Sequence, residues 1–111
     1  MHRHEGFTSV ECELGKLETG AANLCAPDPV YAKLATSITL KSTKAHKLVT
    51  KAKGNAKTAQ ALLNRAAKQL TGLRNRITKA GDKGKITTAC RAKLDALVGE
   101  RLVLVQGLGT P

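Results

Sequence analysis

Histidine and cysteine, together with carboxylates, are the residue types of this chain that could hold a metal ion. The histidines stand at positions 2, 4 and 46 and the cysteines at positions 12, 25 and 90. A zinc site needs three or four convergent ligands, commonly supplied by closely spaced pairs. No Cys-x-x-Cys pair occurs. The sequence therefore predicts no metal site and no cofactor, and His46, which stands between Lys44 and Lys47, is expected to be structural or solvated.

The residues needed for catalysis are also few. Residues 32–111 contain only three acids, Asp82, Asp95 and Glu100, which gives little scope for a pair of catalytic carboxylates. Residues 81–85 (Gly-Asp-Lys-Gly-Lys) superficially resemble a phosphate-binding loop. They follow a predicted helix instead of a strand and lack the Lys-Ser/Thr ending, so we expect a polar turn. We predict no catalytic residue and no enzyme activity.

Net charge gives the strongest signal. The chain has 19 Lys and Arg against 8 Asp and Glu, a formal charge of +11. Residues 1–31 hold two basic and five acidic residues (−3), and residues 32–111 hold 17 basic and three acidic ones (+14). Such a field attracts an anionic surface, an acidic protein or a nucleic-acid backbone. The alternative is a solvated, lysine-rich surface without a dedicated partner.

Basic residues at helical spacing are the candidate anion-binding residues. We expect them to form a stripe on the second and third predicted helices, consisting of Lys41, Lys44, Lys51, Arg65, Lys68, Arg76 and Lys79. Lysine, which supplies 13 of the 19 basic residues, acts as a point charge and reads bases poorly. Aromatic residues make up only 2% of the chain, so stacking platforms for single strands are missing. Recognition of a nucleic-acid sequence is therefore not expected.

Apolar residues recur at steps of three and four along nearly the whole chain, which predicts four amphipathic helices. Helices are expected over about 7–24, 29–53 and 56–80, and from Thr87 or Thr88 onward. The predicted core positions are Phe7, Val10, Leu14, Leu17, Ala21 and Leu24; Tyr31, Leu34, Ile38, Ala45, Leu48 and Ala52, with Lys41 in the skipped place; Ala59, Leu63, Ala66, Leu70, Leu73, Ile77 and Ala80; and Cys90, Leu94, Leu97 and Leu104, flanked by Val98, Leu102 and Val105.

Capping residues mark the expected helix ends. Asp28-Pro29 is a typical helix start, and Gly54-Asn55 would end the second helix and cap the third. Gly81 would close the third helix. With 111 residues and 41% hydrophobic content, we expect one domain over 1–111, frayed over 1–6. The predicted fold is all-α, an antiparallel up-down-up-down four-helix bundle. The second choice is a three-helix bundle with residues 1–27 as an irregular strap.

Cys25 and Cys90 are predicted to form a disulfide. In this topology, the connection between the first two helices and the turn between the last two lie at the same end of the bundle. The two cysteines could therefore reach the ~4.4–6.8 Å Cα separation of a disulfide. Cys12 lies ~20 Å further along the first helix and is a poor partner. The alternative is that Cys25 and Cys90 are buried free thiols.

Four segments resemble helical modules near the C-termini of exported, mostly uncharacterised bacterial proteins. They are residues 44–52 (Lys-Ala-His-Lys-Leu-Val-Thr-Lys-Ala), 62–70 (Leu-Leu-Asn-Arg-Ala-Ala-Lys-Gln-Leu) and 84–94 (Gly-Lys-Ile-Thr-Thr-Ala-Cys-Arg-Ala-Lys-Leu), with 5–14 as a lead-in. The resemblance implies a non-catalytic module in an extracytoplasmic or secreted setting. No apolar run reaches the ~20 residues of a membrane span, and the first residues do not form a signal peptide. This is compatible with a piece of a longer exported protein.

Residues 60–94 are also similar to the small helical ribosomal protein that binds small-subunit RNA. In that family, too, an Ala/Lys-rich helix is followed by a Lys-Gly-x-Ile turn and a second basic helix. The acidic segment 5–28 and the three cysteines depart from it, and an arginine-rich N-terminal helix is missing. This resemblance implies the alternative function, a cytoplasmic protein that binds the RNA or DNA backbone.

Overall fold

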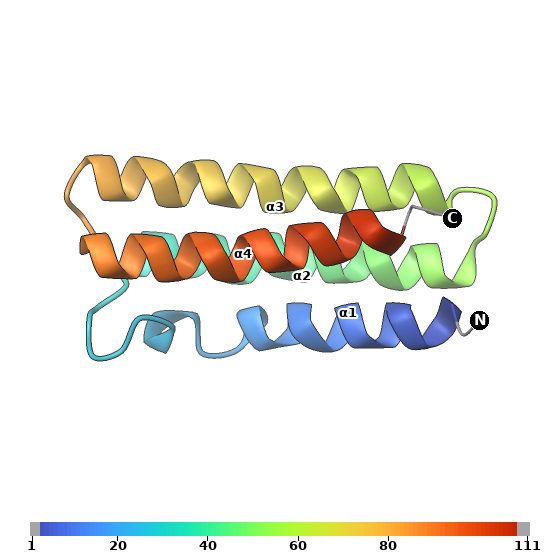
Figure 1. Ribbon diagram of the computed structural model, residues 1–111, viewed down its shortest axis with the longest axis horizontal. Coiled ribbons are helices and arrows are strands. Elements are labelled where there is room, and N and C mark those ends of the chain that lie inside the picture. Colours follow the sequence, from blue (N-terminus) through green and yellow to red (C-terminus); the bar gives the residue numbers. More distant parts are fainter. Residues whose placement is uncertain (1–2, 109–111) are drawn as a thin grey trace.

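Four α-helices in series form the protein (Figure 1). The computed structural model describes residues 3–108, with side chains from residue 6 onward. The helices are α1 (Arg3–Glu18), α2 (Ala32–Gly54), α3 (Ala59–Asp82) and α4 (Thr88–Leu108), with a short 3₁₀ helix, η1 (Ala21–Asn23), between the first two. No strand occurs within residues 3–108. The predicted all-α class is confirmed.

The helices form an antiparallel up-down-up-down bundle of 43 × 20 × 19 Å. Each helix packs against the next one in the chain, and α1 also contacts α4, which closes the bundle. The α1–α2 connection and the α3–α4 turn lie at one end, which we call the disulfide end, and the α2–α3 turn lies at the other (Figure 1). The alternative three-helix bundle is wrong, because much of the expected strap is the regular helix α1. The frayed segment expected over 1–6 overlaps the first turn of α1, and residues 1 and 2 lie outside the described part.

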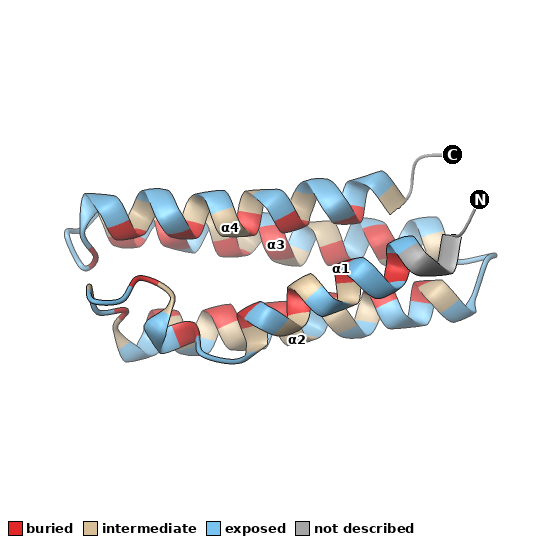
Figure 2. Cartoon of the chain, turned by 60° about the horizontal axis from the view of Figure 1, so that its bottom comes forward, coloured by how far each residue is buried: buried red, intermediate tan, exposed pale blue. Residues whose placement is uncertain are grey.

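One continuous core runs along the bundle, and the buried residues form stripes on the inward helix faces (Figure 2). The predicted positions on α1 and α3 are buried, apart from Ala59, which is half-buried at the start of α3. Leu24 is also only half-buried, because α1 ends at Glu18 and does not continue to residue 24. The glycine that follows, Gly20, has a φ of 77°, a left-handed conformation that interrupts the helix.

On α2 the predicted core register is wrong in the second half of the helix. The buried residues after Ile38 are Ser42, Ala45, Val49 and Ala52. Ser42 takes the place assigned to Lys41, and Val49 takes that of Leu48, because the helix turns 100° per residue and drifts away from a strict heptad. Lys41 is half-buried, and its amine lies 3.5 Å from the position that a Cβ would take at Gly72 of α3. The missing side chain there leaves room for the lysine stem.

On α4 the buried face is Cys90, Leu94, Val98, Arg101 and Val105. Leu97 is half-buried, and Leu104 is 40% exposed, so the prediction that Leu104 is a core residue is wrong. The cause is again the 3.6-residue period of a straight helix, which favours the flanking valines over the heptad leucines. Arg101 fills the remaining place, and only 6% of its surface is exposed.

The helix starts differ from expectation by three residues. Helix α2 begins at Ala32, after Tyr31 as N-cap, and not at Pro29. The Asp28 carboxylate instead accepts a hydrogen bond of 2.9 Å from the hydroxyl of Thr87. Helix α3 begins at Ala59 and not at residue 56, so Asn55 closes α2 and does not cap α3.

The segment 81–85 is a turn, as predicted, and Gly84 is the glycine that ends α3. Gly84 has a φ of 69° and donates its N–H to the carbonyl of Gly81, while the Lys85 N–H reaches the carbonyl of Ala80. This pair of hydrogen bonds is a Schellman motif. The Thr87 hydroxyl then accepts a 3.0 Å hydrogen bond from the Cys90 N–H and caps α4.

The predicted disulfide between Cys25 and Cys90 is confirmed, with a Cα–Cα separation of 5.2 Å. Both cysteines are buried, and the bond ties the α1–α2 connection to the first turn of α4. Cys12 is a free, exposed thiol on α1. Across residues 3–108, no helix combines the length and the apolar composition that crossing a bilayer requires.

Candidate anion-binding face

Three carboxylates of α1, those of Glu11, Glu13 and Glu18, contact polar or basic side chains of neighbouring helices. Glu11 accepts hydrogen bonds from the hydroxyl of Thr50 at 2.6 Å and from the amine of Lys53 at 3.2 Å, both on α2. Burial raises the pKa of Glu11, but these two hydrogen bonds and the nearby positive charge together outweigh it, so the pKa lies below its ordinary value. The charge of Glu11 therefore offsets positive charge of α2 at the α1–α2 seam.

His46 lies at the same α1–α2 seam. Its Nδ1 is 2.6 Å from Oε1 of Glu18, and its Nε2 is 3.8 Å from Oε2 of Glu11. Within the described residues, no group of three or more histidine, cysteine or carboxylate side chains is arranged to hold a metal ion. The geometry gives His46 a structural place between two α1 carboxylates.

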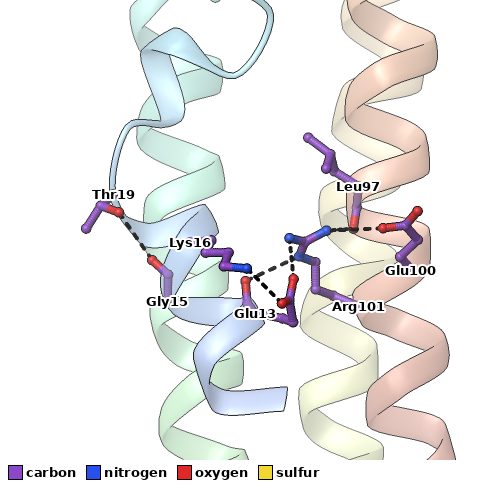
Figure 3. A network of polar contacts seen from close by, with 7 residues as sticks. All are labelled: Glu13, Gly15, Lys16, Thr19, Leu97, Glu100 and Arg101. Atoms are coloured by element: carbon purple, nitrogen blue, oxygen red, sulfur yellow. Dashed lines mark hydrogen bonds and ion pairs between the residues drawn. The ribbon is translucent and has the colours of Figure 1, made fainter. Parts of the chain in front are cut away.

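Arg101 joins α4 to α1 (Figure 3). Its Nη2 donates to Glu13 Oε1 at 2.9 Å and its Nε donates to the Glu13 carbonyl at 3.2 Å, while Nη1 donates to the Leu97 carbonyl at 3.0 Å. Lys16 also donates to Glu13, at 2.9 Å, and this hydrogen bond lowers the pKa of the Glu13 carboxyl. The Glu13 carboxylate is therefore shared between Lys16 of α1 and Arg101 of α4.

Two acids, Asp82 of α3 and Asp95 of α4, form ion pairs at the seam between these two helices. Arg74 of α3 makes a two-pronged contact with Asp95 of α4, at 2.9 and 3.0 Å, and this hydrogen bonding lowers the pKa of Asp95. Asp82 lies 3.5 Å from Arg91. Neither acid offsets charge on the side of α3 that faces α2.

The remaining cations are concentrated on α2, α3 and their adjoining loops. Among the described side chains, 13 lysine and arginine residues make no ion pair. Twelve of these belong to residues 33–85, and the exception is Lys93 on α4. The twelve are Lys33, Lys41, Lys44, Lys47, Lys51, Lys57, Arg65, Lys68, Arg76, Lys79, Lys83 and Lys85. Positive charge is thus neutralised at the α1 and α4 seams and left free on the α2–α3 hairpin.

Most of the predicted anion-binding residues lie along one side of this hairpin. On α3, Arg65, Lys68, Arg76 and Lys79 are all exposed and recur on the same side of the helix. On α2, Lys44 is exposed, and Lys41 lies over Gly72 of α3. Lys51 differs, because it lines a groove shared with Glu18 of α1. We define the basic face as Lys33, Lys41, Lys44, Arg65, Lys68, Arg76, Lys79 and Lys83.

A pocket of about 180 Å³ opens in the basic face at the disulfide end. It lies between the first turns of α2 and the last turns of α3. Its basic lining residues are Lys33, Arg76, Lys79, Lys83 and Lys85, and its other lining residues are Tyr31, Leu34, Ser37 and Ala80. The amine of Lys85 lies 5.4 Å from the centre of the Tyr31 ring, at a cation–π distance. No acidic residue lines this pocket.

Sequence reasoning identified two of the pocket's basic residues, Arg76 and Lys79, and missed the contribution of the turn. From the sequence, Lys83 and Lys85 are expected only in a polar turn, and Lys33 only as one of the lysines of the second predicted helix. A signal was present, because an antiparallel hairpin places the end of α3 beside the start of α2. The same argument that paired Cys25 with Cys90 could have assembled these lysines.

Comparison with known protein families, characterised proteins and solved structures finds no match to this chain.

Proposed function

We propose that the chain is a non-enzymatic interaction module of an exported bacterial protein, and that its basic face binds an anionic surface or partner. The observation that carries the proposal is the separation of charge. The carboxylates of Glu11, Glu13 and Glu18 are engaged at the α1 seams, whereas the basic face has no ion pair within the described residues. A field of one sign on one face attracts polyanions and speeds their association.

The chemistry of the face favours charge recognition over base recognition. Six of its eight residues are lysine, which contacts an anion as a point charge. Among the described residues, the aromatic residue beside this face is Tyr31, which is half-buried, and its ring lies beside the Lys85 amine. A surface of this kind suits a repeating array of negative charges, such as an acidic polysaccharide or an anionic lipid layer.

The disulfide supports the extracytoplasmic part of the proposal. Disulfides persist in oxidising compartments and are rare in the cytosol. The Cys25–Cys90 bond is buried and joins two segments 65 positions apart, so it is a structural link within the bundle. It weighs against the alternative of a cytoplasmic protein that binds RNA or DNA.

Binding to two polyanions at matched charge density tests the proposal. Fluorescence anisotropy would compare heparin, a sulfated polysaccharide, with single-stranded poly(U) RNA over a range of salt concentrations. We expect tighter binding to heparin that persists at about 0.15 M salt, where the Debye length is ~8 Å. Tighter binding to the RNA would favour the alternative function. Equal, weak binding to both that vanishes at 0.15 M salt would indicate a solvated surface and would contradict both functions.

A further inference from the structure

The pocket at the disulfide end differs from the rest of the basic face in its concentration of cations. Five cationic side chains from three segments line one cavity: Lys33 from α2, Arg76 and Lys79 from α3, and Lys83 and Lys85 from the turn that follows. Elsewhere on the face, Lys44, Arg65 and Lys68 are exposed side chains spread along α2 and α3. The fold gathers charges here that are far apart in the sequence.

Local structure brings the turn cations to the pocket. The Schellman turn at Gly84 directs Lys83 and Lys85 back toward the start of α2. The Tyr31 ring lies beside the Lys85 amine, and the disulfide closes the same end of the bundle. Mutual repulsion of five cations opposes this arrangement in the free protein, and a bound anion would relieve it.

The groups in the pocket match a small, doubly charged oxyanion. Lysine amines donate up to three hydrogen bonds each, and the Arg76 guanidinium presents a fork that fits two oxygens of one phosphoryl group. Tyr31 and Ser37 add hydroxyl groups to the lining. The first turn of α2 carries N–H groups without a side-chain cap, and the helix dipole there favours negative charge.

Size and charge narrow the ligand class. At about 180 Å³ the cavity is smaller than the ~300–1,000 Å³ pockets that enclose drug-sized ligands. It therefore suits a single anionic group and not a whole nucleotide. A phosphomonoester carries about −1.5 to −2 charges at pH 7, more than a phosphodiester, a carboxylate or a sulfate ester, and so gains most from five cations.

We propose that this pocket binds a phosphomonoester group displayed by the anionic surface that the basic face contacts. This inference rests on the proposed function, since it identifies the group that the face would recognise. The wider face supplies long-range attraction, and the pocket supplies selectivity among anions. Terminal phosphates on a polymer and on a lipid headgroup share this chemistry.

The test is an NMR titration of the ¹⁵N-labelled, disulfide-bonded full chain with glycerol phosphate. Sodium methyl sulfate, a singly charged sulfate ester, and sodium chloride at equal ionic strength are the reference titrants. We expect saturable amide shifts confined to residues 31–37 and 76–85, at concentrations where the reference salts cause none. Shifts that spread over all lysines and rise without saturation would overturn the pocket assignment.

A charge-matched pair of variants separates the pocket from the general field. Arg76→Gln combined with Lys79→Gln should weaken glycerol phosphate binding about tenfold or more, because two charge-assisted hydrogen-bonding groups are lost. Lys44→Gln combined with Lys68→Gln removes the same charge outside the pocket and should change it less than about twofold. Equal weakening by the two pairs would overturn the pocket and leave heparin binding, and with it the proposed function, intact.

Vesicles identify the source of the phosphomonoester. Phosphatidic acid has a monoester headgroup and phosphatidylglycerol a diester, so vesicles of each at equal surface charge isolate the contribution of the group. Tighter binding to phosphatidic acid vesicles than to soluble glycerol phosphate, compared per phosphate group, supports a lipid source. Equal affinity for phosphatidic acid vesicles and for soluble glycerol phosphate supports a phosphate carried by a polymer. Preference for phosphatidylglycerol over phosphatidic acid would overturn the proposal.

Discussion

Arg101 and Glu13, 88 positions apart in the sequence, form a polar contact that joins α4 to α1. The Arg101 side chain is only 7% exposed, whereas that of Glu13 is 31% exposed. The arginine stem occupies a core position of α4, and its head reaches the Glu13 carboxylate and the Glu13 carbonyl. One side chain thus both packs in the core and fixes the position of α1.

Replacement of Arg101 should loosen α1. Arg101→Ala removes the buried stem and its hydrogen bonds, and we expect it to lower the free energy of unfolding by about 2 kcal/mol. Arg101→Met keeps most of the stem and should cost clearly less. Urea denaturation measures both variants. Equal losses for the alanine and methionine variants would show that the charged head, and not the packing of the stem, carries the contribution.

The core of α3 gives a sharp contrast between neighbouring positions. Leu70 is fully buried and Lys68 is exposed. We predict that Leu70→Ala lowers the free energy of unfolding by ~2–5 kcal/mol, as truncation of buried leucine does, and that Lys68→Ala leaves it within about 0.5 kcal/mol. Denaturant midpoints measure the difference. The reverse order would show that the register of α3 is wrong.

Reduction of the disulfide should destabilise the bundle. The Cys25–Cys90 bond closes a loop with a sequence separation of 65. The chain-entropy relation gives a stabilisation of about 4 kcal/mol for such a loop, which the double replacement Cys25→Ser, Cys90→Ser should remove. Cys12→Ser is the control and should leave the thermal midpoint unchanged, because Cys12 is exposed and free.

Mass spectrometry of protein from an oxidising host should find one free thiol. Three free thiols, or a Cys12–Cys25 link, would exclude the bond.

Acid should weaken the α3–α4 seam. The Arg74 hydrogen bond lowers the pKa of Asp95 in the folded protein, so the ion pair contributes its full stability above the unfolded-state pKa and loses it as the pH falls through the folded-state value. The pair is solvent-exposed and screened, so the contribution is a few tenths to about 1 kcal/mol. Unfolding measured between pH 7 and pH 2 should lose this contribution below about pH 4. Asp95→Asn should reduce the acid dependence, and an unchanged pH profile would show that the pair contributes nothing.

The helix number, the topology and the disulfide could be predicted from the sequence because each depends on patterns repeated along the chain. The steps of three and four on α1 and α3 identify the buried residues of these helices almost completely. On α2 and α4, two apolar positions often stand side by side, as Leu48 and Val49 do. The pattern then does not decide which one faces the core, and the 3.6-residue period together with the neighbouring helices does.

The polar partnerships could not be predicted from the pattern alone. The burial of Arg101 depends on the position of Glu13 on α1, and the pocket depends on how the turn at Gly84 folds back on α2. The burial of Arg101 and the shape of the pocket each depend on helices that are far apart in the sequence and meet only in the folded bundle. The basic stripe was predicted from spacing on single helices, and this reasoning placed Arg76 and Lys79 but not the turn lysines beside them.

In the proposed function, the basic face, and not net charge alone, binds the anionic partner. The most direct measurement compares heparin affinity at about 0.15 M salt for two triple variants of equal net charge. One carries Lys44→Gln, Arg65→Gln and Lys68→Gln on the face, and the other carries Lys47→Gln, Lys57→Gln and Lys93→Gln outside it. We predict a loss of about tenfold or more for the face variant and a much smaller loss for the other, because screening confines the interaction to nearby charges. Equal losses would contradict the account.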